Sequence, residues 1–262
     1  MTSLLEIDNI GISFGGVQAL FGVTLDIRRG EIFAVIGPNG AGKTTLFNII
    51  SGLYPPRQGR VSLDGKDITG LPPHALARRG MSRTFQNLQV FFRMSAVENV
   101  MVGRHMHEKR NALAHMLALP SIQRQNRQTR IVAEELLALV GLSELADKPA
   151  GNLPYGALKR LEIARAIAAE PSILLLDEPA AGCNPIETEE IDKLIKTISR
   201  RGVTIVLVEH DMRLVMKISD RIHVLDHGTT LAEGDAATVR ENPAVIAAYL
   251  GDHATMERHA RR

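Results

Sequence analysis

The chain has 262 residues, of which 45% are hydrophobic and 23% charged, proportions typical of a globular protein with a sizeable core. Its 31 basic and 29 acidic residues give a net charge of +2, which excludes an overall charge imbalance as the basis for binding nucleic acid or anionic lipid. The only cysteine, Cys183, excludes an intrachain disulfide and favours a reducing compartment. No apolar run reaches the ~20 residues of a membrane-spanning helix, and no signal peptide is expected. Any membrane association must therefore come through a partner.

The first third of the chain predicts a mostly antiparallel sheet. Apolar and polar residues alternate over 4–10 and 22–27, as in half-buried antiparallel strands. A turn that carries Phe14 is expected between them. The apolar run 32–36 predicts a buried strand, and 59–65 predicts a short strand with an Asp-Gly turn.

A glycine-rich loop follows the 32–36 strand and precedes a predicted helix over 45–50. It fits the phosphate-binding pattern G-x-x-x-x-G-K-[ST], with residues Gly37, Pro38, Asn39, Gly40, Ala41, Gly42, Lys43, Thr44 and Thr45. Glycines let the main chain bend until several N–H groups converge on one anion, and the helix N-terminus adds positive charge. Lys43 supplies charge for the terminal phosphates, and the Thr44 hydroxyl can ligate Mg²⁺. A chance Lys-Thr in a glycine-rich turn is the alternative, but it leaves the flanking strand and helix unexplained.

The middle of the chain predicts helices. A short helix is expected over 71–80, because proline stands at its start and glycine at its end, and an extended segment follows over 81–86. From 95 to 107 the pattern is helical again, with Ser95 and Glu98 as a capping box.

Residues 108–130 are polar and basic, and the apolar spacing over 131–140 is helical. We interpret the basic run as a solvated helix face, with a contact surface as the alternative. The whole stretch 88–160 is predicted to be a helical insertion.

The last third alternates between helices and apolar strands. Helices are predicted over 154–169, 187–201, 235–241 and 243–250, and strands over 172–178, 203–208, 221–226 and 229–233. This β-α-β alternation predicts a parallel sheet with right-handed crossovers, whose ligands bind beyond the carboxyl ends of the strands. Gly37, Asp177 and His210 follow three such ends and are expected to converge.

Four polar residues are candidates for chemistry at this edge. Asp177 is expected to hold Mg²⁺, directly or through water, and Glu178 to polarise an attacking water as general base. The alternative is that Asp177 and Glu178 are simply carboxylates at the end of a strand that face solvent. Neutral His210 can hydrogen-bond a γ-phosphate or orient Glu178, and Gln86 can contact Mg²⁺ or water. Taken alone, either of these last two residues can be merely structural.

These motifs occur in the order found in the ATP-binding subunits of ABC transporters, which the chain resembles over residues 4–250. Within that superfamily it is most similar to the ATPase subunits of branched-chain amino-acid importers. The segments that carry this resemblance are Arg83-Thr84-Phe85-Gln86, Leu153-Pro154-Tyr155-Gly156, 160–165, 178–185, 209–212 and 249–251. The resemblance implies an α/β P-loop NTPase fold, with a RecA-like parallel-sheet core, an antiparallel β subdomain and a helical subdomain. It divides a single domain, 1–252, into a core lobe (1–87 and 161–252) and a helical lobe (88–160), and a flexible tail (253–262) follows the domain.

The resemblance also implies residue roles and the cofactors ATP and Mg²⁺. Phe14 stacks on adenine, the loop 37–45 binds the phosphates, and Gln86 couples the site to the membrane partner. The metal ligands are Thr44, Gln86 and Asp177, while Glu178, His210 and Gln86 serve hydrolysis. The signature stretch, defined as Leu153, Pro154, Tyr155, Gly156 and Ala157, caps the ATP held by an opposite subunit, and 182–185 cross the dimer interface.

The signature stretch departs from the family's usual Leu-Ser-Gly-Gly-Gln. Pro154 stands at the serine position, Tyr155 at the first glycine and Ala157 at the glutamine, so the hydroxyl that would contact the partner's γ-phosphate is missing. Gly156 and the helix N-terminus remain, and their backbone N–H donors can replace the missing hydroxyl. Pro-Tyr-Gly is usual in the branched-chain importers, whereas Ala157 and Leu158 depart from them.

The implied partners are transmembrane permease subunits, a second ATP-binding subunit and, indirectly, a solute-binding protein, with no nucleic acid. The altered signature stretch favours a paralogue over a second copy. Val90, Phe91, Phe92 and Met94 offer apolar contacts to the membrane subunits, with ordinary packing between lobes as an equal alternative. The implied location is peripheral, on the cytoplasmic face of the inner or plasma membrane.

The resemblance implies an ATP-hydrolysing subunit that powers an importer for branched-chain or other hydrophobic amino acids. The alternative is a soluble ABC-type ATPase that acts on nucleic acid or ribosomes; it is disfavoured because the chain shows one domain and near-neutral charge. A GTPase is disfavoured because no Asn-Lys-x-Asp run occurs. Since half of the site must come from a partner, the isolated chain is expected to bind ATP and hydrolyse it poorly.

Overall fold

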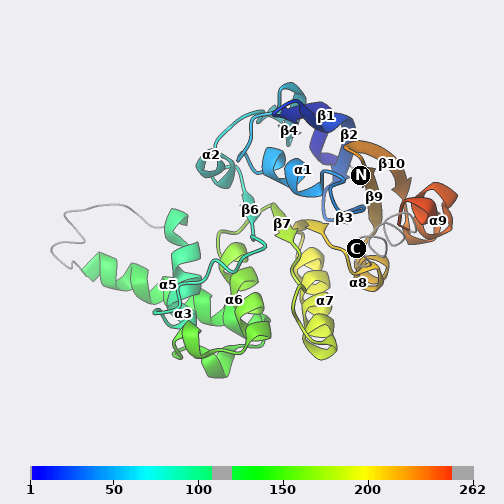
Figure 1. Cartoon of the computed structure of the whole chain (residues 1–262). Coiled ribbons are helices and arrows are strands. Elements are labelled where there is room, and N and C mark those ends of the chain that lie inside the picture. Colours follow the sequence, from blue (N-terminus) through cyan, green and yellow to red (C-terminus); the bar gives the residue numbers. More distant parts are fainter. Residues whose placement is uncertain (1, 108–119, 250–262) are drawn as a thin grey trace.

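A six-stranded sheet lies at the centre of the fold (Figure 1), and its strand order is β10-β9-β3-β8-β7-β6. The computed structural model describes residues 2–107 and 120–249. The strands are β3 (Ile32–Ile36), β6 (Met81–Arg83), β7 (Ile173–Asp177), β8 (Thr204–Val208), β9 (Arg221–Asp226) and β10 (Thr229–Gly234). All neighbours are parallel except the β9–β10 pair. The predicted parallel sheet is confirmed.

The central strands β3, β7 and β8 are buried throughout and mostly apolar, because both of their faces are covered. Successive side chains of a strand point to opposite faces. Accordingly Ile32, Ala34 and Ile36 of β3 belong to one hydrophobic cluster with the helices, while Phe33 and Val35 belong to a second cluster with α1 and the antiparallel sheet. β7 and β8 alternate in the same way.

A four-stranded antiparallel sheet, ordered β2-β1-β4-β5, packs against one face of the central sheet. Its strands are β1 (Ser3–Phe14), β2 (Val17–Arg28), β4 (Gln58–Leu63) and β5 (Lys66–Asp67). The first two strands are longer than predicted, because register shifts let their pairing continue past polar residues. Phe14 was predicted in a turn, but it ends β1, and only Gly15-Gly16 forms the turn. The Asp-Gly turn is confirmed, with positive φ at Asp64 and Gly65.

Helices cover both faces of the central sheet. They are α1 (Lys43–Ile50), α2 (Pro73–Ala77), α3 (Ala96–Gly103), α5 (Pro120–Leu139), α6 (Tyr155–Ile167), α7 (Pro185–Arg200), α8 (Met212–Ile218), α9 (Ala236–Glu241) and a last helix over 243–249. Short 3₁₀ turns cover His105–His107, Ser143–Leu145 and Ala150–Asn152. Helices α3, α5 and α6 pack on one another (Figure 1), and α6 also contacts α7 through the Arg160–Glu190 pair.

The helical predictions hold with two qualifications. The capping box is confirmed, because Ser95 accepts from the Glu98 backbone amide and Glu98 from that of Ser95. Helix α8 was not predicted, although Asp211 caps it through bonds from Arg213 and Leu214. Because α6 runs unbroken through residue 160, the lobe boundary proposed there lies within a helix, and the division into lobes stays a prediction.

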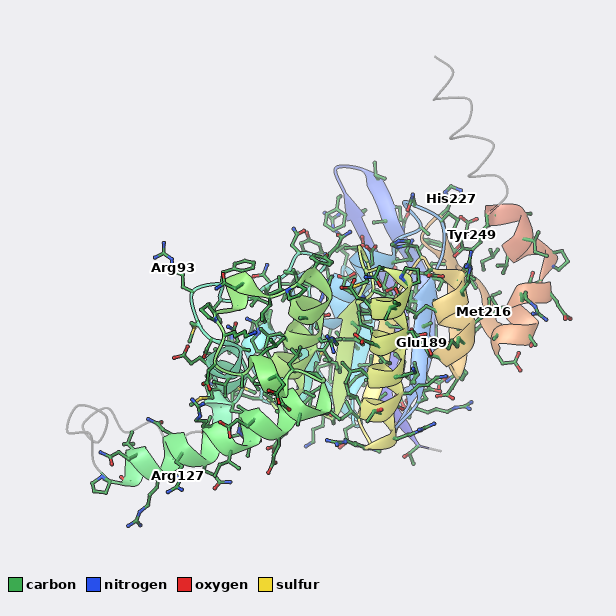
Figure 2. The ribbon with its side chains drawn as sticks, turned by 90° about the horizontal axis from the view of Figure 1, so that it is seen from below. Arg93, Arg127, Glu189, Met216, His227 and Tyr249 are labelled. Atoms are coloured by element: carbon green, nitrogen blue, oxygen red, sulfur yellow. The ribbon has the colours of Figure 1, made fainter. Side chains whose placement is uncertain are left out.

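The basic run falls partly on α5, which extends away from the rest of the molecule with Arg127 near its far end (Figure 2). Arg124 and Arg127 are exposed, and Arg130 pairs with Glu134 and Asp147 at 2.8 and 2.7 Å. Over the described part, this agrees with a solvated helix face. Residues 108–119 and the predicted tail 253–262 lie outside the described residues.

Arg221 and His223 of β9 hold the edge of the central sheet through Glu233 of β10. His223 is fully buried, with Nδ1 2.8 Å from a Glu233 oxygen, and Arg221 pairs with the other oxygen of that carboxylate. Burial raises the pKa of Glu233, but the hydrogen bonds with His223 and Arg221 outweigh burial and hold it below its usual 4.5. The network therefore favours the ionised carboxylate.

Glu233→Gln should destabilise the protein in a pH-dependent way. Because the folded-state pKa is depressed, the stabilisation from Glu233 is present above pH 4.5 and is lost as the pH falls through the folded value. Urea unfolding at pH 6.5 and at successively lower pH should show the difference between wild type and variant shrinking. A difference that does not change with pH would contradict this account.

Candidate active site

The glycine-rich loop joins β3 to α1 at the carboxyl edge of the central sheet. Gly37, Gly40 and Gly42 have φ values of 152°, 79° and 102°, which favour glycine. Helix α1 begins at Lys43, two residues earlier than predicted, and none of the described side chains caps it. Lys43 Nζ donates to the carbonyls of Gly37 and Pro38 at 2.7 and 2.9 Å. The ammonium and the uncapped helix start thus lie together, as anion binding requires.

Neighbouring strands enclose this loop closely. A Cβ on Gly37 would lie 2.1 Å from the Leu225 carbonyl oxygen, and one on Gly42 would lie 2.8 Å from that of Ala19. The Gly228 amide also donates to Ala41 O at 3.0 Å. The loop conformation is therefore set by β2 and β9 as well as by its own sequence.

Phe14 remains available for stacking on a base. Its ring is 45% exposed and meets Tyr54 edge-on, with centroids 5.4 Å apart. The strand that carries Phe14 is joined to the segment after Tyr54, because Arg57 N donates to Gly11 O at 2.9 Å. Tyr54, which the sequence did not single out, supports the ring through this contact.

Gln86, Glu178 and His210 are brought together from three separate segments. Gln86 Nε2 lies 3.2 Å from Glu178 Oε2, and His210 Nδ1 lies 3.7 Å from Glu178 Oε1. Glu178 follows β7 and is held by a bond of its amide to Val208 O at 2.9 Å. Its φ of 50° is unusual for a residue other than glycine, and such strain concentrates at functional sites. The carboxylate is 21% exposed and can reach water.

Asp177 is buried beside this cluster and pairs with Arg83, which the sequence analysis did not count as a site residue. Arg83 Nη2 donates to Asp177 Oδ2 at 2.7 Å, and Nη1 donates to Asn48 and Ser51 at 2.8 and 2.6 Å. The guanidinium also lies over the ring of Phe85, 5.1 Å from its centroid. Arg83 thus ties the end of β7 to α1 and to the segment that carries Gln86.

The donors predicted for Mg²⁺ fit it chemically. Thr44, Gln86 and Asp177 offer a hydroxyl, an amide oxygen and a carboxylate, all oxygen ligands of the kind that Mg²⁺ takes. Among the described residues, no group of three or more His, Cys, Asp or Glu side chains could hold a metal. A metal here would therefore need additional oxygens, such as those of phosphate.

The signature stretch leads into α6. Pro154 occupies the N-cap without a side-chain bond. The Tyr155 hydroxyl donates to Ala181 O at 3.2 Å, and a Cβ on Gly156 would lie 2.4 Å from a Glu187 oxygen. Glu187 closes a capping box with Asn184 at the start of α7. The signature stretch therefore contacts the 181–184 segment of its own chain.

Buried Glu209, just before His210, was also missed. Its two oxygens accept from the backbone amides of Ala180 and His210, at 3.0 and 3.2 Å. Burial raises its pKa. A carboxylate directly after the apolar run 205–208 was the available signal, because such a group must find donors when buried.

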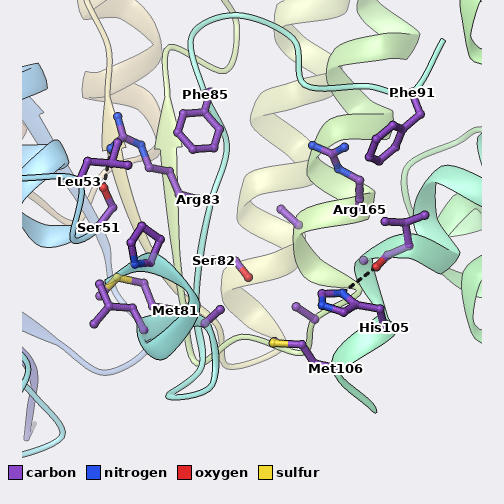
Figure 3. Close-up of a pocket in the computed structure, with 17 residues that line it drawn as sticks. Ser51, Leu53, Met81, Ser82, Arg83, Phe85, Phe91, His105, Met106 and Arg165 are labelled. Carbon is purple, nitrogen blue, oxygen red and sulfur yellow. Dashed lines mark hydrogen bonds between the residues drawn. The ribbon is translucent and has the colours of Figure 1, made fainter. Parts of the chain in front are cut away.

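An apolar cavity of about 350 Å³ lies between α2, β6, α3 and α6 (Figure 3). Its walls include Phe85, Phe91, Arg83, Arg165 and His105. The Arg165 guanidinium lies over the Phe91 ring, 5.4 Å from its centroid.

The residues predicted to contact the membrane subunits differ in their exposure to solvent. Phe91 and Phe92 are about half-exposed, at 47% and 50%, and Met94 is partly buried. The inclusion of Val90 was wrong: it is buried and belongs to the hydrophobic core.

Comparison with known proteins agrees with this geometry. The family model described as "ABC transporter" matches residues 20–181, which contain the phosphate loop, Gln86, the signature stretch and Glu178. The chain belongs to the ABC transporter ATP-binding family. Its members hydrolyse ATP to drive transport, and so does this protein. A second model, "Branched-chain amino acid ATP-binding cassette transporter", matches residues 229–255.

The ABC ATPase is similar over nearly its whole length to curated relatives. It is 48% identical to the high-affinity branched-chain amino acid transport ATP-binding protein BraF of Pseudomonas aeruginosa, over 95% of this chain and 98% of that one. It is 45% identical, with the same coverage, to the corresponding protein LivG of Escherichia coli strain K12.

A solved structure of an ATP-binding cassette of an ABC transporter, in its ADP conformation, has a TM-score of 0.84 to this ABC ATPase. It is 32% identical and covers 96% of this chain and 100% of its own. The predicted α/β P-loop fold is confirmed.

None of the helices within the described ranges is long and apolar enough to cross a membrane.

Proposed function

We propose that this ABC ATPase powers a membrane importer for branched-chain or other hydrophobic amino acids. The names of its 45–48% identical relatives and the family segment at 229–255 support this solute class. The convergence of Gln86 and His210 on Glu178, beside the phosphate loop, is the observation that carries the hydrolytic role.

Each side chain at the site has a task in this proposal. Residues 37–45 cradle the phosphates, and Phe14 stacks on the adenine. Thr44, Asp177 and Gln86 hold Mg²⁺, which neutralises phosphate charge when bound. Glu178 takes a proton from the attacking water, while His210 hydrogen-bonds the γ-phosphate and holds the Glu178 carboxylate in place.

Two ATP-binding subunits close each site. The phosphate loop holds ATP from one side, and a partner's signature stretch caps it from the other. In this chain that stretch offers Gly156 and the uncapped N-terminus of α6, which supply backbone donors and a partial positive charge. Because the usual serine hydroxyl is absent, a paralogue with a fuller signature is the favoured second subunit.

The cavity of about 350 Å³ is the proposed docking site for the permease subunit (Figure 3). Its apolar walls suit an apolar segment of that subunit, and Phe91 and Phe92 extend the surface beyond it. Phe85 and Arg83 line the cavity. Arg83 pairs with Asp177 and Phe85 directly precedes Gln86 in the chain, so an occupant would contact the immediate neighbours of two site residues. Docking there places the ABC ATPase peripherally, on the cytoplasmic face of the membrane.

The test is reconstitution of the ABC ATPase, its copurifying membrane subunits and their solute-binding protein in liposomes. ATP-dependent uptake of labelled leucine, isoleucine or valine is expected, together with stimulated ATP turnover. Uptake confined to a polar or ionic solute would overturn the solute class but leave the ATPase role intact. Nucleic-acid-stimulated turnover without membrane subunits would favour the alternative, a soluble ATPase that acts on nucleic acid.

A further inference from the structure

One buried carboxylate, which has no role in the proposed binding or hydrolysis of ATP, holds the segment that carries Gln86. Glu162 lies on α6, about one and a half turns beyond the end of the signature stretch, and is 3% exposed. Its Oε1 accepts the backbone amide of Gln89 at 3.2 Å, and the backbone amide of Phe85 is near enough to the carboxylate to help lower its pKa. Residues 85 and 89 flank Gln86 on both sides. A single side chain of α6 therefore bonds one end of this loop, at Gln89, and lies beside the other, at Phe85.

Core packing alone does not explain a carboxylate at this position. Burial raises the pKa of Glu162, which means that the fold opposes its charged form, and the two backbone donors and the charges of Lys159 and Arg165 offset this only in part. An apolar side chain would avoid that cost. A carboxylate is explained if its task is to hold the loop that carries Gln86.

The same helix also touches the segment that carries Glu178. Lys159 Nζ, which is buried, lies 3.4 Å from Glu178 O, and the Tyr155 hydroxyl donates to Ala181 O at 3.2 Å. Gln86 in turn bonds the Glu178 side chain. One rigid helix thus begins at the signature stretch and contacts both segments whose side chains meet at the proposed catalytic cluster.

We propose that Glu162 is a positioning residue that ties the Gln86 segment to α6. The position of the signature stretch, where α6 begins, is thereby coupled to the contact between Gln86 and Glu178. This inference rests on the proposed hydrolytic role of the cluster. Glu162 contacts no reacting atom; it acts by holding the Gln86 backbone at the distance from which its amide reaches Glu178. A displacement of about 1 Å at such a site can lower the rate ~100-fold.

The test compares ATP turnover of the full-length protein in its transporter complex for Glu162→Gln and Glu162→Ala. Glutamine keeps one acceptor oxygen, so we expect kcat to fall about tenfold, whereas alanine should lower it ~100-fold. KM for ATP should stay within about twofold, because the phosphate loop is untouched. Hydrogen exchange of the amides in 85–89 should accelerate in Glu162→Ala.

The matched control is Glu31→Gln. Glu31 is also buried, has a raised pKa because of burial, and accepts a backbone amide, that of Arg28, but it lies at the start of β3, away from the site. The Glu31→Gln variant should lose about as much stability as Glu162→Gln and keep the wild-type kcat. Measuring thermal unfolding alongside separates misfolding from mispositioning, and Glu162→Gln serves if the alanine variant does not fold.

A double-mutant cycle decides whether Glu162 acts through Gln86. In a Gln86→Ala background, Glu162→Ala should cause no further fall in kcat. An equal fall in both backgrounds, or a rise in KM with kcat unchanged, would overturn the positioning role. If Glu178→Gln instead kept wild-type turnover, the result would count against the proposed catalytic cluster itself. Failure of the positioning role and failure of the proposed hydrolytic role are therefore distinguishable.

Discussion

Glu178→Gln is expected to bind ATP with near wild-type affinity while turnover falls by at least ~100-fold. The glutamine amide keeps the size of the side chain but cannot accept a proton from water. It can still bond Gln86, since the separation of 3.2 Å between the two side chains allows either orientation. With hydrolysis blocked, ATP should hold two ATP-binding subunits together.

Single-turnover hydrolysis and ATP titration measure these two effects separately, and size-exclusion chromatography with Mg²⁺ and ATP detects the trapped dimer. Glu135→Gln, on the exposed face of α5, is the matched control and should behave like wild type. Turnover unchanged in Glu178→Gln would remove this residue from the role of general base.

Gly37→Ala is expected to weaken ATP binding strongly, whereas Gly40→Ala should have a mild effect. A Cβ at Gly37 would lie 2.1 Å from the Leu225 carbonyl oxygen, so the loop or β9 must move. Gly40 also has a positive φ, but its Cβ would meet nothing within 4 Å. Its replacement therefore costs only the left-handed conformation, about 1–2 kcal/mol.

We expect an ATP affinity at least ~10-fold weaker in Gly37→Ala, which corresponds to the loss of one charge-assisted hydrogen bond to phosphate. Calorimetric titration with ATP, alongside thermal unfolding, measures both quantities. Equal effects in the two variants would show that backbone strain, and not the approach to Leu225, decides the requirement for glycine.

The sequence predicted local structure well, because its determinants are local. The glycine-rich loop, the Ser95–Glu98 capping box and the apolar central strands each depend on residues within a few positions of one another. Helix α8 was missed because no element was assigned between Asp211 and the strand predicted at 221–226, although Asp211 is a good N-cap. The length of β1 was underestimated because register shifts depend on the partner strand.

The convergence of Gly37, Asp177 and His210 was also predictable, since parallel strands end at one edge of a sheet. The pairing of Asp177 with Arg83, 94 residues away in the chain, was not. Nor was the attachment of the Gln86 loop to Glu162, which lies 73 residues from Gln89. No periodic pattern marks such contacts, because each joins single side chains from elements that the sequence does not align.

By itself, then, the sequence determined the fold class, the phosphate loop and the edge of the sheet where the site lies, because these follow from periodicity, turn chemistry and strand direction. Only the tertiary structure decided which side chains meet there. Burial forces isolated charges such as Arg83, Glu162 and Glu209 to find partners, and which partners they find depends on how distant elements pack.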